Sequence, residues 1–106
     1  MKKINPNINI ERLREHSWAL WDPIGLSATM GGWTGQPFED EYDVYISKAA
    51  EMLRENRELE EVIAHLFYIQ SQYIGVGPKK MDDLICAKLR TLVIAISEDH
   101  SIWYEN

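Results

Sequence analysis

The sequence predicts an all-α, single-domain bundle of about four helices with a long glycine-rich loop between the first and second helices. Apolar residues recur at helical spacing in four separate stretches. Residues 22–37 hold four of the six glycines. A chain of 106 residues, 45% of them hydrophobic, is long enough to bury one core without disulfides or metals. We therefore treat 1–106 as one helical domain in which residues 1–8 form a flexible N-terminal segment.

The first helix is expected to begin after Asn9, a residue type that caps helices. Asp22 precedes a proline, which disfavours the α conformation, so the helix should end there. In "DPIG" the Asp, Pro and Gly occupy positions that favour a type I turn. The apolar stripe of this helix comprises Ile10, Leu13, Leu20 and Trp21, with Ser17 within it and Trp18 on its flank.

Two tryptophans stand directly before this turn, in "WALWDPIGL" at residues 18–26. They could close the helix onto the core, or they could form the edge of a binding site. The sequence favours the first interpretation, with Trp21 in the core. The loop that follows would then be the part that recognises a partner.

Residues 22–37 form that loop, and loops of this length are often functional or mobile. Trp33 lies within it between glycines, as "GGWTG". Its ring could fold back onto the core or point outward toward a partner. Burial of aromatic rings favours the first position, and the loop remains the best candidate for a site.

A second helix is expected to begin near Pro37, where Glu39, Asp40 and Glu41 would complement the positive end of the helix dipole. Its inward stripe is Tyr42, Tyr45, Ile46, Ala49 and Leu53. Its outward face is Asp40, Asp43, Ser47, Glu51 and Glu55. Val44 would lie among the outward acids, a position that suits an interface.

A third helix is expected from Leu59 to Ile74, ending at Gly75. Its inward stripe is Leu59, Val62, Ile63, Leu66, Phe67, Gln70, Tyr73 and Ile74. Gln70 falls in its apolar stripe, where we expect it to be hydrogen-bonded across the core. A fourth helix is expected from about Pro78 to Glu98. Its apolar positions are Met81, Leu84, Ile85, Leu89, Leu92, Ala95 and Ile96. Trp103 and Tyr104 in the tail are expected to dock on the bundle.

The net charge of -6 comes from one part of the chain. Residues 36–61 carry nine acidic and three basic side chains, and the rest of the sequence is balanced. An acidic surface repels nucleic acid and membranes and attracts basic proteins. A solvated helix face that keeps the protein soluble is the plainer interpretation of the same charges.

The sequence contains no recognisable metal, cofactor or catalytic motif. Glu61 and His65, one helical turn apart, are the strongest local pair of ligands, and no second such pair exists, so we expect an exposed salt bridge there. Cys86 stands alone and is expected to be a small core residue. "GGWTG" lacks the spacing and the lysine of a phosphate-binding loop. These observations argue against an enzyme, although an enzyme that uses the loop as a lid remains an alternative.

The ends and apolar runs of the chain indicate a cytoplasmic protein. "MKKINPNINI" has the lysines of a signal peptide without the apolar stretch that follows them. The longest aliphatic run, "LVIAI" at 92–96, is far shorter than a membrane span. No basic cluster is long enough to indicate nucleic-acid binding.

"WDPIGL" (21–26) and "DEYDVY" (40–45), taken together, resemble motifs in a group of small, mainly helical bacterial proteins of unknown function. The resemblance covers roughly residues 13–75. It implies a helical fold, a bacterial origin and a turn that neighbours the acidic, aromatic start of a helix. It also implies that Asp22 or Asp43 hydrogen-bonds to loop amides. In general character the chain is similar to the immunity proteins encoded beside secreted toxins.

We therefore expect a protein-binding module, in its sharpest form an immunity protein that neutralises a basic secreted toxin such as a nuclease by direct binding. The candidate partner-binding residues are Trp33, Glu39, Asp40, Glu41, Asp43 and Val44. The alternative is a structural or regulatory helical protein that self-associates through apolar faces into a homo-oligomer. Salt distinguishes the two, because only charge-driven association weakens steeply as salt rises.

Overall fold

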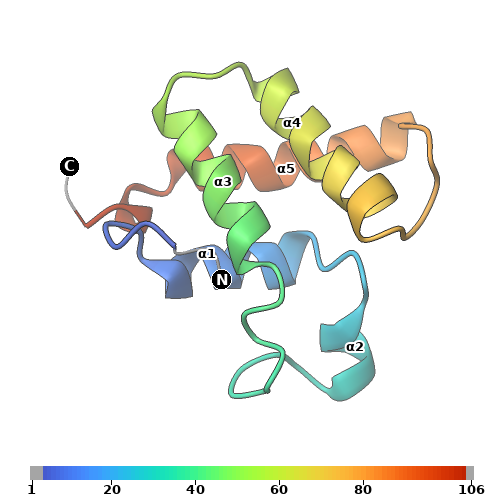
Figure 1. The fold of residues 1–106 in the computed structure, drawn as a ribbon, viewed down its shortest axis with the longest axis horizontal. Helices are drawn as coiled ribbons and strands as arrows, with labels where there is room; N and C mark the ends of the chain where they lie inside the picture. Colours follow the sequence, from blue (N-terminus) through green and yellow to red (C-terminus); the bar gives the residue numbers. More distant parts are fainter. Residues whose placement is uncertain (1–3, 105–106) are drawn as a thin grey trace.

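Four helices build the bundle in a computed structural model that describes residues 4–104 (Figure 1). They are α1 (Ile10–Leu20), α3 (Asp43–Arg54), α4 (Leu59–Tyr68) and α5 (Asp83–Glu98). Helix α5 packs against both α1 and α4, and α3 packs across α1 and α4 in turn. The predicted all-α bundle of about four helices is confirmed.

The core lies where these four helices meet. Its largest fully buried side chains include Leu13 and Trp21 from α1 and its end, Ile46 from α3, Leu66 from α4, and Leu89 and Leu92 from α5. Most of these positions belong to the apolar stripes that the sequence predicts. Burial of one apolar face of each helix therefore sets the arrangement of the four helices.

A long segment joins α1 to α3 and contains a short helix, α2 (Leu26–Met30), which the sequence did not predict. Helix α2 buries none of its residues and projects away from the bundle (Figure 1). It lies between Gly25 and Gly31, which both have positive φ angles, of 80° and 76°. Glycine adopts this left-handed conformation without the steric cost that a Cβ imposes.

Helix α3 begins at Asp43, so the predicted start near Pro37 is wrong. The preceding residues form successive tight turns, in which Glu39 N–H donates to the Gln36 carbonyl and Glu41 N–H to the Phe38 carbonyl. The ring of Phe38 packs against Trp18 of α1. This tertiary contact prevails over the local helix signals of a proline followed by acidic residues.

Helix α4 continues into a single π-helical turn, η1 (Ile69–Tyr73), and the chain leaves it through Gly75, whose φ is 83°. The predicted end of this helix at Gly75 is confirmed. The predicted inward position of Tyr73 is wrong, because its side chain is 67% exposed. A π-helical turn closes i→i+5 bonds, so the spacing used for the prediction no longer holds there.

Helix α5 begins at Asp83, after Asp82, whose carboxylate accepts a hydrogen bond from the Ile85 amide at 2.8 Å. The predicted start at Pro78 therefore lies too early. Leu84 is 80% exposed, so its assignment to the apolar stripe is also wrong. The buried line of α5 runs through Leu89, and Leu84 lies on the outer side of that line.

The two ends of the described chain pair with each other. Ile8 is buried and forms an antiparallel bridge with Trp103, and the Tyr104 amide donates to the Asn7 carbonyl at 2.9 Å. The predicted flexible segment 1–8 is thus held at Ile8, while residues 1–3 lie outside the described residues. Trp103 packs against the core as predicted, whereas the side chain of Tyr104 is exposed.

Candidate functional site

The segment that carries most of the predicted site, residues 22–41, is attached to the bundle at three places, and we call it the lobe. The first attachment is Asp22. Its Oδ1 accepts hydrogen bonds from the amides of Gly25 and Leu26, both at 3.1 Å, and its Oδ2 accepts one from the Ser27 amide at 3.0 Å. A carboxylate at the start of α2 satisfies amides that the helix leaves unpaired. The contact of Asp22 with loop amides, implied by the family resemblance, is present.

Tyr42 connects the same carboxylate to α3. Its hydroxyl donates to Asp22 Oδ1 at 2.8 Å and accepts from the Ile24 amide at 3.0 Å. Burial raises the pKa of Tyr42, so the hydroxyl keeps its proton and remains a donor. The turn after α1 and the residue preceding α3 are therefore neighbours, as the resemblance implies.

Trp18 forms the second attachment. Its ring is stacked with that of Trp33, the centroids 6.2 Å apart and the planes 7° from parallel. Its Nε1 donates to the Glu39 carbonyl at 3.1 Å. Trp33 is half-buried and packs against the core, so its ring folds back toward the bundle. Of the two positions that the sequence leaves open for Trp33, the structure shows the anchored one.

Arg14 forms the third attachment, and the sequence analysis did not identify it. Its guanidinium donates to both oxygens of Asp43, at 3.0 and 2.7 Å, and reaches Glu39 Oε1 at 3.3 Å. The hydrogen bond to Asp43 raises the pKa of Arg14, and burial opposes that shift. The available signal was an arginine directly beside the apolar stripe of the first helix.

Asp43 is only 8% exposed, so its predicted outward position is wrong. The residue is the first of α3, and both oxygens of its carboxylate accept from Arg14 of α1. Its charge is therefore neutralised within the fold by Arg14. Glu39 is also engaged, because its Oε2 accepts from the Gly35 amide at 3.1 Å.

The remaining predicted acids, Asp40 and Glu41, are exposed, and neither has an ion pair within residues 4–104. Two apolar side chains of the lobe are also exposed, Ile24 and Met30, the latter by 53%. The lobe thus exposes both unpaired carboxylates and apolar atoms. Val44 is half-buried and lies outside the lobe, in the wall of a cavity.

Trp21 closes the core at the base of the lobe. Its side chain is 2% exposed, and its Nε1 donates to Gln70 Oε1 at 2.9 Å. The prediction of a core position for Trp21 is confirmed, and so is the prediction that Gln70 is hydrogen-bonded across the core.

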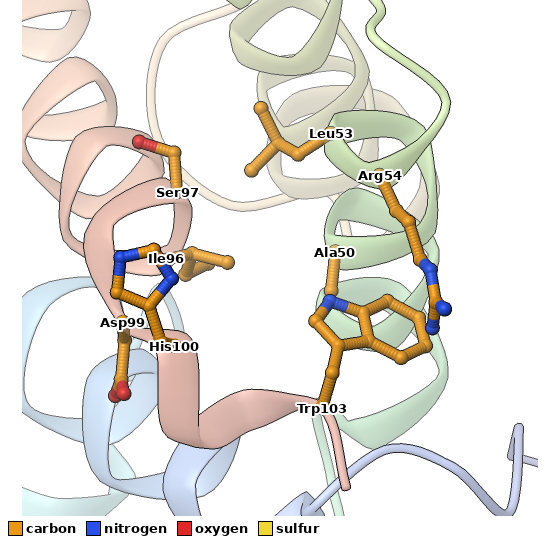
Figure 2. A pocket seen from close by; sticks show the side chains of 8 residues that line it. All are labelled: Ala50, Leu53, Arg54, Ile96, Ser97, Asp99, His100 and Trp103. Atoms are coloured by element: carbon orange, nitrogen blue, oxygen red, sulfur yellow. The ribbon is translucent and has the colours of Figure 1, made fainter. Parts of the chain in front are cut away.

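A first cavity, of about 310 Å³, lies between α3, the end of α5 and the tail (Figure 2). Ala50, Leu53 and Ile96 supply apolar walls, and Trp103 and His100 lie on opposite sides. The guanidinium of Arg54 lies over the Trp103 ring, 4.2 Å from its centroid. This stacking fixes the Trp103 ring as one side of the cavity.

Ser97, Asp99 and His100 also line this cavity, but their contacts do not assemble a catalytic group. The Ser97 hydroxyl donates to the Ile94 carbonyl at 2.8 Å. Asp99 Oδ2 accepts from Arg12 Nη2 at 2.8 Å and lies 2.7 Å from His16 Nε2. Both groups are engaged elsewhere, so this geometry does not pair a nucleophile with a base.

A second cavity, of about 580 Å³, lies between α3 and the α4–η1 helix. Its lining residues include Val44, Tyr45, Lys48, His65, Ile69 and Tyr73. His65 Nε2 is buried and has no hydrogen-bond partner within the described residues. Glu61 instead pairs with Arg57 Nη2 at 2.9 Å, so the predicted Glu61–His65 salt bridge is wrong. The imidazole turns inward because α3 packs over that flank of α4.

No group of three or more candidate metal ligands occurs within residues 4–104. In the same part of the chain no helix has both the length and the apolar character needed to cross a membrane. Comparison of the sequence and the fold with protein-family models, curated proteins and solved structures gives no match. The resemblance to small helical bacterial proteins therefore stays a prediction.

Proposed function

We propose that the chain is a protein-binding module that recognises a basic protein through the outward side of the lobe. In its specific form the partner is a secreted toxin such as a nuclease, and binding neutralises it. The observation that carries the proposal is the construction of the lobe. Its inner side is attached through Asp22, Trp18 and Arg14, while its outer side has exposed groups that no intramolecular contact explains.

Preorganisation supports this proposal. A loop of this length that moved freely would lose conformational entropy on binding, and the three attachments remove most of that cost beforehand. Exposed apolar side chains such as Met30 supply contact area, and the exposed carboxylates of the same lobe accelerate encounter with a basic partner. Asp40 and Glu41 are the residues available for this role, because Asp43 is paired with Arg14.

The experiment is capture of proteins from the source organism on the immobilised chain, at low and at high salt. The test variant is Asp40→Lys/Glu41→Lys. The matched control, Asp83→Lys/Glu98→Lys, makes the same change in net charge at the two ends of α5. Far-ultraviolet circular dichroism confirms that each variant is folded. The captured protein is then purified and assayed for cleavage of nucleic acid, with and without the chain.

The proposal predicts one basic protein that the wild type and the control capture at low salt and that the lobe variant loses. Inhibition of its activity by the chain would support the immunity form. Equal loss in the control would indicate non-specific charge attraction and contradict a site on the lobe. Recovery of the chain alone, unaffected by salt, would favour the alternative of self-association through apolar faces.

A further inference from the structure

The second cavity has the size and walls of a small-molecule site. Its volume of about 580 Å³ lies within the range in which proteins bind small ligands. Val44 and Ile69 provide apolar surface, and the rings of Tyr45 and Tyr73 meet edge to face with centroids 5.7 Å apart. Such a wall favours a ligand with an aromatic ring.

The charged residues of the cavity favour a neutral ligand. Lys48 and Glu51 carry opposite charges and lie one turn apart or less on α3. The field of one therefore offsets that of the other, and a ligand with net charge of either sign gains little from the pair.

His65 supplies the polar feature of the wall. Burial lowers the pKa of its imidazole, a hydrogen bond to the Tyr45 backbone raises it, and the charge of Lys48 lowers it further. The ring is therefore neutral at pH 7. A neutral imidazole has one N–H. Because the contact with the Tyr45 backbone raises the pKa, the ring is the donor in it, and because Nε2 has no partner we assign the N–H to Nδ1. Nε2 is left as a buried acceptor without a donor, which is rare in folded proteins.

The π-helical turn points to the same cavity independently. Its first and last residues, Ile69 and Tyr73, both line the wall. A π-helical turn is less stable than the α-helix that it interrupts, and such turns occur frequently at functional sites. Here the turn brings the Tyr73 ring against that of Tyr45, where regular α-helical spacing would place it differently.

We propose that this cavity binds a small, uncharged aromatic molecule with one hydrogen-bond donor, as in a phenol or an indole, and that the donor bonds to His65 Nε2. This site is separate from the lobe and does not depend on the function proposed for it. Nε2 is screened from solvent in the unliganded chain. Binding therefore requires a lining side chain to move, and the one assigned to this movement is Tyr73, which lines the cavity and is 67% exposed.

The test compares phenol with toluene, which have the same ring and differ in the donor. Each is titrated into the full chain labelled with ¹⁵N, and amide shifts are followed by NMR. Phenol should shift amides of residues 44–51 and 65–73 and bind roughly five- to tenfold more tightly than toluene, which is the net effect of one buried hydrogen bond. His65→Leu should remove this preference and retain toluene binding.

Two further variants keep the test decisive. His65→Gln retains an acceptor and should retain a preference for phenol. It replaces His65→Leu in the test if that variant does not fold. His100→Leu changes the histidine of the first cavity and should leave both affinities unaltered. Equal affinity of the wild type for the two ligands would overturn the proposal. So would a preference that survives in His65→Leu, or shifts confined to the surroundings of Trp103.

Discussion

The hydroxyl of Tyr42 lies 2.8 Å from Asp22 Oδ1 and donates to it, so the residue before α3 holds the carboxylate that organises the lobe. The same hydroxyl accepts from the Ile24 amide. The carboxylate in turn accepts from the amides of Gly25, Leu26 and Ser27. One pair of side chains thus joins the end of α1, the start of α2 and the start of α3.

Tyr42→Phe removes this link without changing the shape of the core. The Ile24 amide loses its acceptor and Asp22 loses a donor, so we expect a loss of about 1–2 kcal/mol in the free energy of unfolding. Urea denaturation measures the loss, and faster amide hydrogen exchange at residues 24–27 would place it in the lobe. Tyr104→Phe, at an exposed tyrosine, is the control and should have no effect. A loss in Tyr42→Phe with unaltered exchange in the lobe would contradict this role.

Trp21→Ala should destabilise the protein by roughly 3–5 kcal/mol, because it leaves a large cavity in the core. Trp21→Phe keeps most of the ring but deprives Gln70 Oε1 of its donor, so we expect about 1–3 kcal/mol. Chemical denaturation of both variants gives the two values. Equal losses in both would show that the hydrogen bond, rather than ring volume, accounts for the contribution of Trp21.

Asp43→Ala separates the structural acid from the exposed ones. Breaking its pair leaves the Arg14 guanidinium partly buried without its main partner, and we expect a loss of about 3–5 kcal/mol. Asp40→Ala should change stability by less than about 0.5 kcal/mol, as for ordinary surface positions. Thermal denaturation of the two variants side by side is the measurement. Similar stabilities would refute the distinction between these neighbouring acids.

Features encoded by short-range pattern could be predicted from the sequence. The apolar periodicity predicts the four helices, and "DPIG" predicts the turn, in which the Gly25 amide bonds to the Asp22 carbonyl at 3.0 Å. The core position of Trp21 was also predicted, as was the place of Gln70 in the apolar stripe of its helix, although its partner was not. Each of these depends on residues within a few positions of one another or on the plain preference of large apolar groups for the core.

Features that depend on a distant partner could not be predicted in this way. Asp43 is buried because Arg14, 29 residues earlier, lies opposite it. His65 turns inward because α3 covers it, and Tyr73 departs from helical spacing because of a π-helical turn. Within the candidate site the largest difference between prediction and structure is at Asp43. The pattern of one helix predicts an exposed acid there, whereas the fold places Arg14 against a buried one.

Asp99 should make stability depend on pH below about 4. Burial raises the pKa of its carboxyl, but hydrogen bonds from Ser101, His16 and Arg12 outweigh burial, and the pKa lies below its ordinary value. A group with a depressed folded pKa stabilises the fold above its unfolded pKa, about 3.9 for Asp, and loses this contribution as pH falls through the folded value. Asp99→Asn should therefore be less stable than the wild type by about 2 kcal/mol at pH 7.

The difference between Asp99→Asn and the wild type should shrink from pH 4 to pH 2, because the Asp99 carboxyl of the unfolded wild-type chain takes up a proton in this range while the folded carboxyl stays ionised. Urea denaturation at pH 7, 4, 3 and 2 measures it. Glu98→Gln changes the adjacent exposed acid and should show no such trend. A difference that stays constant down to pH 2 would mean that Asn fails for steric reasons. A difference that becomes smaller as the pH falls would show that the charge of Asp99 stabilises the contact between α1 and the tail.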